Sequence, residues 1–297
     1  MQPLTDAAFD LLHSMTHLIL QSPSLMAAHV EQIAAIVSAS GVQELGNTAV
    51  RLLEADASEL KAVAAHCETY GMDYAFLPQI DLLRERRILA MDMDSTLISI
   101  ECIDEIADAV GRKPQVAAIT EAAMRGEIKD FSESLRRRVE LLEGVPESAL
   151  LEVYEQRLRL NPGAEQLISV VKQHGLKTLL VSGGFTFFTE RLRERLSLDA
   201  CHANVLEVVG GKLTGNVLGD IVDAGGKAAH LAALAADLGA ARDQIIAVGD
   251  GANDLEMMAL AHYSVAYRAK PVVRDKAAYA LNYSPLSGVL NWFRLSH

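Results

Sequence analysis

The sequence predicts an α/β fold, with an open, doubly wound, mostly parallel sheet that carries an inserted helical cap and follows a small α+β domain. Three apolar runs predict the sheet, because each has the length of a buried parallel strand and ends abruptly in polar residues or glycines. A long helical stretch between the first two runs predicts the cap. We place the small domain at residues 1–82, the larger domain at 83–297 and the cap at about 101–160.

Residues 15–80 alternate between strand and helix patterns. The expected strands lie at residues 15–20, 42–45, 48–53 and 74–77. Ser24 and Ser58 are expected to cap two helices that end at Gly41 and Gly71. The resulting order βαββαβ is that of a ferredoxin-like fold, and nothing in this region indicates catalysis.

The three apolar runs of the larger domain each lead into residues that can bind a ligand. The runs span residues 87–91, 177–181 and 244–248. Two aspartates follow the first run, a hydroxyl beside glycines follows the second, and another aspartate follows the third. Ligands of open α/β sheets bind at the carboxyl ends of the strands, so these residues are expected to form one site.

Residues 101–160 are almost wholly helical in pattern and are more than a single crossover helix needs. An insert beside the strand ends would act as a lid that excludes water and contacts the substrate. Met124, Phe131 and Arg138 recur at intervals of seven, so a continuous helix would place them on one face. Packing within the cap explains Met124 and Phe131 about as well as substrate contact does.

Asp92 and Asp94 are the first candidate catalytic residues. Two acidic residues at this spacing can reach one hard cation such as Mg²⁺ through one side chain and one backbone carbonyl. A carboxylate beside Mg²⁺ can attack a phosphoryl group and form an aspartyl phosphate, while the second acid protonates the leaving oxygen and then activates water. A helix cap or a structural ion explains an isolated Asp-x-Asp equally well.

Three further segments extend this chemistry. Asp250, between two glycines that allow close backbone approach, offers another cation ligand. Ser182 and Gly183 offer a hydroxyl and unobstructed backbone N–H groups to phosphate oxygens. Lys227, near an expected helix start, can hold a phosphoryl group together with the helix dipole. Taken singly, a turn, an ordinary loop and a surface lysine are the plainer explanations.

Together, in their chain order, the motif segments resemble the haloacid dehalogenase superfamily of phosphohydrolases over residues 87–297. The resemblance narrows to the phosphoserine phosphatase family. It rests on four runs of sequence, namely Met91–Thr96, Phe131–Val139, Val181–Phe185 and Val248–Asp254. It implies a HAD-like, Rossmann-type sheet, and in this family an ACT-like ferredoxin domain often precedes the catalytic part.

The resemblance also implies a role for each motif residue. Asp92 would be the nucleophile and Asp94 the general acid and base, and Mg²⁺ would be held by Asp92, Asp94 and Asp250. The implied substrate contacts are Glu101, Phe131, Arg138, Ser182, Gly183, Lys227 and Asn253. Among these, Glu101 would take the substrate ammonium and Arg138 its carboxylate, which a guanidinium grips bidentately. The role of Met124 stays open, and Arg136 or Arg137 would replace Arg138 in a different helix register.

The family's reaction is hydrolysis of O-phospho-L-serine to serine and phosphate, the last step of serine biosynthesis. A phosphatase or phosphotransferase acting on another small phosphomonoester is the enzymatic alternative. A non-enzymatic alternative has the small domain bind an amino acid while the larger domain serves as a silent scaffold, but such a scaffold needs none of the motif residues.

Composition limits the partners. The formal charge of −12, from 27 basic and 39 acidic residues, argues against a nucleic-acid-binding surface. No apolar run is long enough to cross a membrane, and three widely spaced cysteines suit free thiols in a reducing cytoplasm. The sequence leaves the oligomeric state open, and ferredoxin-like modules can pair into homodimers.

Overall fold

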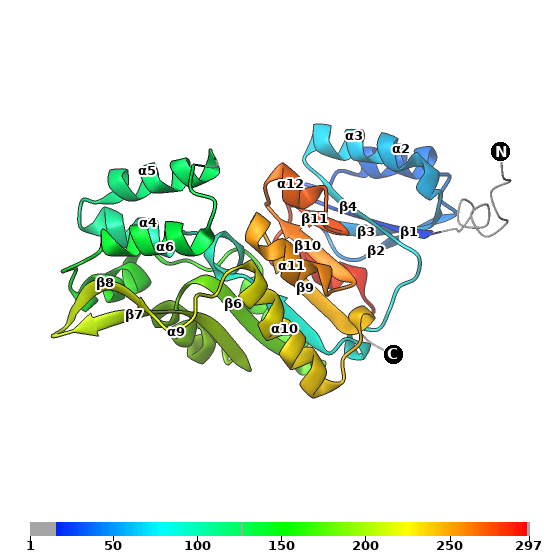
Figure 1. Cartoon of the computed structure of the whole chain (residues 1–297). Coiled ribbons are helices and arrows are strands. Elements are labelled where there is room, and N and C mark those ends of the chain that lie inside the picture. The colour runs from blue at the N-terminus through cyan, green and yellow to red at the C-terminus, as the bar shows by residue number, and fades with distance from the viewer. Residues whose placement is uncertain (1–15, 126, 296–297) are drawn as a thin grey trace, which may run out of the picture.

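The computed structural model describes residues 16–125 and 127–295, which form two β-sheets connected by helices (Figure 1). One sheet is antiparallel and has four strands, and the other is mostly parallel and has seven. Within these residues no helix is both long and apolar enough to span a membrane.

The small sheet has the strand order β2-β3-β1-β4. Its strands are β1 (Thr16–Gln21), β2 (Gly41–Glu44), β3 (Ala49–Ala55) and β4 (Asp73–Leu77). The helices α2 (Ala27–Ile36) and α3 (Leu60–Tyr70) complete the expected order of strands and helices. Met15, at the start of the expected first strand, lies outside the described residues.

Three predicted ends of these helices are wrong. Met26, not Ser24, precedes the first turn of α2, and this helix ends before Gly41, which opens β2. Ser58 lies within the short helical segment Ala57–Glu59 that leads into α3, and Asp56 caps this segment by accepting a bond from the Ser58 N–H. The predicted end at Gly71 is confirmed, since this glycine takes the left-handed conformation that closes α3.

Alternation along the strands gives the small sheet two apolar faces. Leu18, Leu20 and Leu52 pack under α2 and α3, whereas Ile19 and Leu77 join the core of the larger sheet. The small sheet is therefore packed against the rest of the molecule. Figure 1 shows its edge strand β4 beside the edge strand of the larger sheet.

The larger sheet has the strand order β11-β10-β9-β5-β6-β7-β8. Its strands are β5 (Ile88–Met91), β6 (Lys177–Phe185), β7 (Ala200–Val209), β8 (Lys212–Leu218), β9 (Ile245–Gly249), β10 (Tyr263–Tyr267) and β11 (Tyr279–Leu281). All neighbours pair in parallel except β7 and β8, which form an antiparallel hairpin. The three predicted apolar runs are confirmed as the adjacent central strands β9, β5 and β6.

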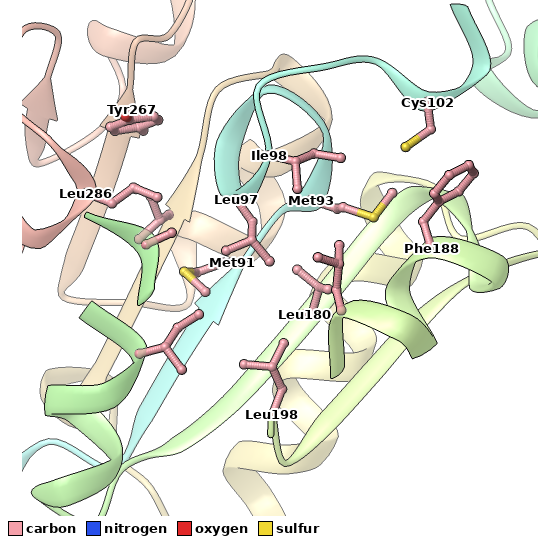
Figure 2. Close-up of a cluster of buried hydrophobic side chains, with 14 of the residues drawn as sticks. Met91, Met93, Leu97, Ile98, Cys102, Leu180, Phe188, Leu198, Tyr267 and Leu286 are labelled. Carbon is pink, nitrogen blue, oxygen red and sulfur yellow. The ribbon is translucent and has the colours of Figure 1, made fainter. Parts of the chain in front are cut away.

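Both faces of the larger sheet are covered by apolar contacts. The α-helices that follow the cap along the chain are α8 (Ala164–Gln173), α9 (Thr186–Leu196), α10 (Ala224–Leu238), α11 (Leu255–Ala259) and α12 (Pro271–Arg274). Along β5, Leu89 and Met91 enter one core cluster while Ile88 and Ala90 enter the other. Figure 2 shows Met91 in the first cluster, next to side chains from the turn after β5 and from β6. Further helical segments, of the 3₁₀ or π type, are Ala57–Glu59, Leu83–Glu85, Met93–Leu97, Val153–Arg157, Arg242–Gln244, Ala252–Asp254 and Leu286–Trp292.

The predicted helical insert lies between β5 and β6. It contains α4 (Cys102–Ala109), α5 (Lys113–Met124), α6 (Phe131–Glu140) and α7 (Glu147–Glu152). Met124, Phe131 and Arg138 would share a face only on a continuous helix, and the structure has none there, because α5 ends at Met124 and α6 begins at Phe131. Asp130 caps α6 by accepting a bond from the Ser132 N–H, so a new helix starts there. The Met124 side chain lies outside the described part of the structure.

Candidate active site

The carboxyl ends of β5, β6 and β9 meet below the cap at a cavity of about 70 Å³. Eight of the ten predicted site residues line it, namely Asp92, Asp94, Glu101, Phe131, Arg138, Ser182, Gly183 and Asn253. The other two, Lys227 and Asp250, lie beside it and contact residues of the same strand ends. The predicted residues therefore converge on one place.

A buried lysine joins two of the strand ends. Lys227 is fully buried on the second turn of α10, and its Nζ donates to Oδ1 of Asp92 and Oδ1 of Asp254, each at 2.7 Å. Burial lowers the pKa of Lys227, but the two carboxylates outweigh burial and raise it above its usual value. The lysine is therefore charged, and only one oxygen of Asp92 is engaged by it.

Asp254 fixes the loop after β9. Its Oδ2 accepts from the backbone N–H groups of Asp250 at 3.1 Å and Gly251 at 2.9 Å, while its Oδ1 accepts from Lys227. A Cβ at Gly249 would lie 2.5 Å from Asp254, so only glycine fits there. Asp254 was not among the predicted site residues, although it closes the Gly-Asp-Gly-Ala-Asn-Asp segment.

The carboxylates of the site crowd one another. Burial, followed by Asp254, raises the pKa of Asp92, and Lys227 opposes this rise. The same two causes raise the pKa of Asp250 to about 6. Carboxylate oxygens of Asp92, Asp250 and Asp254 all lie within 4.8 Å of one another. Such crowding favours a bound cation, and oxygen donors are the ligands that Mg²⁺ prefers.

Asp94 has a different environment from Asp92. Its Oδ1 accepts from the Cys102 N–H at the start of α4 at 3.3 Å. Burial, followed by the charge of Glu101, raises the pKa of Asp94 to about 7. A carboxyl group that gains and loses its proton near neutral pH suits general acid and base work.

Two side-chain hydrogen bonds hold the turn after β5, and their donors were not among the predicted site residues. Ser95 adopts a left-handed backbone with φ 56°, and its Oγ donates to Oε1 of Glu101 at 2.6 Å. Thr96 Oγ1 donates to Oδ1 of Asp250 at 3.0 Å. Both residues belong to the run Met91–Thr96, so their place in this run was the feature of the sequence that could have indicated them.

The loop at the end of β6 packs closely against neighbouring side chains. Ser182 is buried, and its Oγ accepts from the Gly184 N–H at 2.8 Å. A Cβ at Gly183 would lie 2.9 Å from the Phe131 ring, so glycine is needed under the cap. Asn204 supports this loop by donating to the Gly183 carbonyl at 2.8 Å, and no motif in the sequence indicated it.

The cap contributes one half-buried cation to the cavity. Arg138 lines the cavity, whereas Arg136 and Arg137 are exposed, so the helix register selects Arg138. Burial lowers the pKa of Arg138, and the acidic groups Asp104, Glu101 and Asp94 oppose this effect. Its Nε donates to the Ser134 carbonyl at 3.3 Å, and no described carboxylate lies within ion-pair distance of the guanidinium.

Comparison with known proteins places this site in a family. The family model described as haloacid dehalogenase-like hydrolase matches residues 89–259, and a domain of unknown function matches residues 18–63. A relative from Polaromonas sp. named phosphoserine phosphatase is 56% identical over 212 residues, which are 70% of this chain and 90% of the relative.

Solved structures agree over almost the whole chain. A HAD family hydrolase from Salmonella enterica serovar Typhi superposes with a TM-score of 0.86 at 33% identity, covering 94% of this chain and 99% of that one. An unliganded probable phosphoserine phosphatase from Vibrio cholerae gives a TM-score of 0.82 at 38% identity, covering 95% and 87%. With its sheet, its strand-end acids and these matches, the chain belongs to the haloacid dehalogenase-like hydrolases.

Proposed function

We propose that this protein hydrolyses O-phospho-L-serine to L-serine and phosphate through an aspartyl phosphate on Asp92. One observation supports it above the others, namely that Asp92 and the unpaired Arg138 guanidinium line the same small cavity. A relative at 56% identity is named for this activity. The cavity thus offers a nucleophile for the phosphoryl group and a cation for the carboxylate of the substrate.

The first step is transfer of the phosphoryl group to Asp92. Oδ1 of Asp92 is held by Lys227, which leaves Oδ2 to attack phosphorus. The bond from phosphorus to the serine oxygen breaks, and Asp94 gives its proton to that oxygen. A pKa of about 7 lets Asp94 carry this proton near neutral pH.

The second step returns the enzyme to its starting state. Asp94, now ionised, takes a proton from a water molecule, and the resulting hydroxide attacks phosphorus and releases Asp92. Throughout, Ser182, the N–H of Gly183 and the Lys227 ammonium bind the phosphoryl oxygens, whose charge grows in each transition state.

A divalent cation fits the residues present. Asp250 offers an oxygen that no lysine or arginine occupies, and Oδ1 of Asp92 keeps a lone pair beside its bond to Lys227. With the backbone carbonyl of Asp94, these oxygens are the proposed Mg²⁺ ligands, and Oδ2 of Asp92 stays free for the attack. Asp254 is engaged by Lys227 and by two N–H groups, so we assign it to holding the loop. When bound, the cation neutralises charge on the transferring phosphoryl group.

Substrate selection belongs to the cap side of the cavity. Arg138 binds the substrate carboxylate and Glu101, oriented by Ser95, binds its ammonium. Phe131 forms the wall over Gly183, and Asn253 lines the cavity on the side of β9.

The rest of the chain is assigned more coarsely. We assign residues 1–82 to a ferredoxin-like, ACT-like domain and residues 83–297 to the phosphatase domain, supported by the separate sheets.

A reducing cytoplasmic setting suits the three free cysteines. The acidic charge argues against nucleic-acid partners, and β2, an edge strand with exposed Val42, is available for pairing into a homodimer.

Phosphate release from a substrate panel with Mg²⁺ tests the proposal. L-Phosphoserine should be turned over far better than phosphoethanolamine, which lacks the carboxylate. Equal turnover of the two would keep the aspartyl phosphate chemistry and exclude phosphoserine as the preferred substrate.

A further inference from the structure

A second cavity, of about 720 Å³, lies away from the active site, between the small sheet and the C-terminal segment. Gln21 of β1 and Arg51 of β3 line one side, and Ser284, Asn291 and Arg294 line the other. Ile19 and Arg51 are direct cross-strand partners, and Ile19 packs into the core of the larger sheet. The Arg51 side chain therefore emerges on the face of the small sheet that meets the larger domain.

The charge of this cavity is opposite to that of the protein. The chain carries a formal charge of −12, yet the described residues lining the cavity include two arginines and no aspartate or glutamate. Arg51 is only 7% exposed, and burial followed by the charge of Arg294 lowers its pKa. In the described part of the chain, neither arginine has a carboxylate within ion-pair distance. Two cations therefore share the cavity without a counterion from the lining.

Two buried hydrogen-bond donors of the lining are also without partners. They are Nε2 of Gln21 and Nε of Arg51, on side chains that are at most 7% exposed. Asn291 donates to Oε1 of Gln21 at 2.6 Å, which leaves Nε2 as the free donor of that amide. Unpaired buried donors are uncommon in proteins, and here they lie beside two guanidinium groups that have no carboxylate partner. Arg51 donates through Nη1 to Oε1 of Gln43 at 3.0 Å, a neutral acceptor that leaves its charge uncompensated.

We propose that this cavity is a binding site for a small oxyanion, held by Arg51 and Arg294 and by the free amide donor of Gln21. Guanidinium groups match the oxygens of phosphate and carboxylate groups alike, so both kinds of anion share the required chemistry. Its ligands come from β1, β3 and the C-terminal segment, so a bound anion would connect the small sheet to the larger domain and stabilise that contact.

The first test locates the anion. Crystals soaked in sodium selenate should show an anomalous selenium peak between the side chains of Arg51 and Arg294, whatever is found at the active site. A soak that shows selenium only at the active site, or nowhere, overturns the proposal.

The second test measures binding in solution. Thermal unfolding is followed with millimolar selenate or malonate against sodium chloride at equal ionic strength, for wild type and Arg294→Gln. At least one anion should raise the wild-type Tm by on the order of 2–4 °C more than the Tm of Arg294→Gln. Binding at the active site is common to both proteins and cancels in this difference.

Two further variants complete the solution test. Arg51→Gln should lose the same part of the shift, and Arg294→Gln, an exposed position, keeps the test valid if Arg51→Gln does not fold. Arg193→Gln on α9 removes the same charge from an exposed position that does not line the cavity, and should retain the full shift. Identical shifts in all four proteins, or none with either anion, would exclude the site. Selenate and malonate responding differently would identify the class of anion.

Discussion

The floor and the cap of the active site are built differently. The floor consists of Asp92, Ser182 and Asp250 at strand ends and of Lys227 on α10, and each of its charged groups has a hydrogen-bond partner within the chain. The cap side (Phe131 and Arg138) faces the same cavity from α6, and its cation has no carboxylate partner among the described residues. The floor residues therefore have their hydrogen-bond partners before a substrate binds, whereas the positive charge of Arg138 can be paired by a carboxylate of the substrate.

This difference separates chemistry from selection. Groups held by bonds of 2.7 Å in a buried network lose no freedom when the phosphoryl group arrives, which favours transition-state stabilisation. An unpaired arginine gains a partner only when a carboxylate enters. Changes to the floor should therefore affect turnover or folding, and changes to the cap should affect which substrate binds.

The largest expected effect is on the floor, at the nucleophile. Asp92→Asn keeps the size of the side chain but removes the attacking carboxylate, so kcat with L-phosphoserine should fall by about 10³–10⁶-fold. Circular dichroism should show an intact fold, since Asp254 still pairs with Lys227. Full activity of this variant would show that another residue is the nucleophile.

The next effect tests whether the floor also supports folding. Lys227→Met leaves the buried carboxylates of Asp92 and Asp254 without their cation, which should lower the free energy of unfolding by about 3–5 kcal/mol. Urea denaturation measures the loss. The double variant Lys227→Met/Asp254→Asn should recover part of it, because one uncompensated charge is removed. An unchanged urea midpoint in the single variant would mean that the pair contributes no net stability.

A change in the cap should affect substrate binding and not turnover or folding. Arg138→Ala should raise KM for L-phosphoserine by about 10–100-fold through loss of a charged hydrogen bond, with little change for phosphoethanolamine. Arg137→Ala is the matched control, because Arg137 lies on the same helix, is exposed and pairs with Glu133. Equal losses with both substrates would show that Arg138 positions the cap and does not bind the carboxylate.

The floor could be predicted from the sequence more completely than the cap. Strand ends are marked by an abrupt change from apolar to polar residues, and adjacent parallel strands bring Asp92, Ser182 and Asp250 together whatever the intervening segments do. The cap has no such constraint. The interval of seven would place Met124, Phe131 and Arg138 on one face only in a continuous helix, but Asp130 caps a new helix that begins at Phe131.

Residues that act through tertiary contacts were beyond sequence reasoning. Asn204 lies on β7, and only the packed sheet shows that it holds the Gly183 carbonyl and accepts from the Val222 N–H. The packing of the two sheets was equally unforeseen. It depends on Asp73 of β4, whose carboxylate accepts from the backbone N–H groups of residues 282–284.

The smallest expected effect crosses the boundary between cap and floor. Glu101 lies at the start of the cap, yet its negative charge contributes, after burial, to the raised pKa of Asp94. Transfer to Asp92 requires Asp94 to be protonated, so kcat/KM should fall as the pH rises through about 7. Glu101→Gln removes a charge that disfavours the ionised form of Asp94, which lowers its pKa and moves this fall to lower pH.

The pH profile should be measured with 3-phosphonooxypropanoate, which lacks the ammonium that Glu101 would bind, so that substrate binding does not mask the shift. Ser95→Gly serves as the comparison, because it removes the bond to Glu101 while glycine accepts the left-handed backbone at this position and the charge stays. A profile that moves in Glu101→Gln but not in Ser95→Gly assigns the effect to charge. If neither profile moves, the cap acts on substrate selection alone, and burial by itself raises the pKa of Asp94.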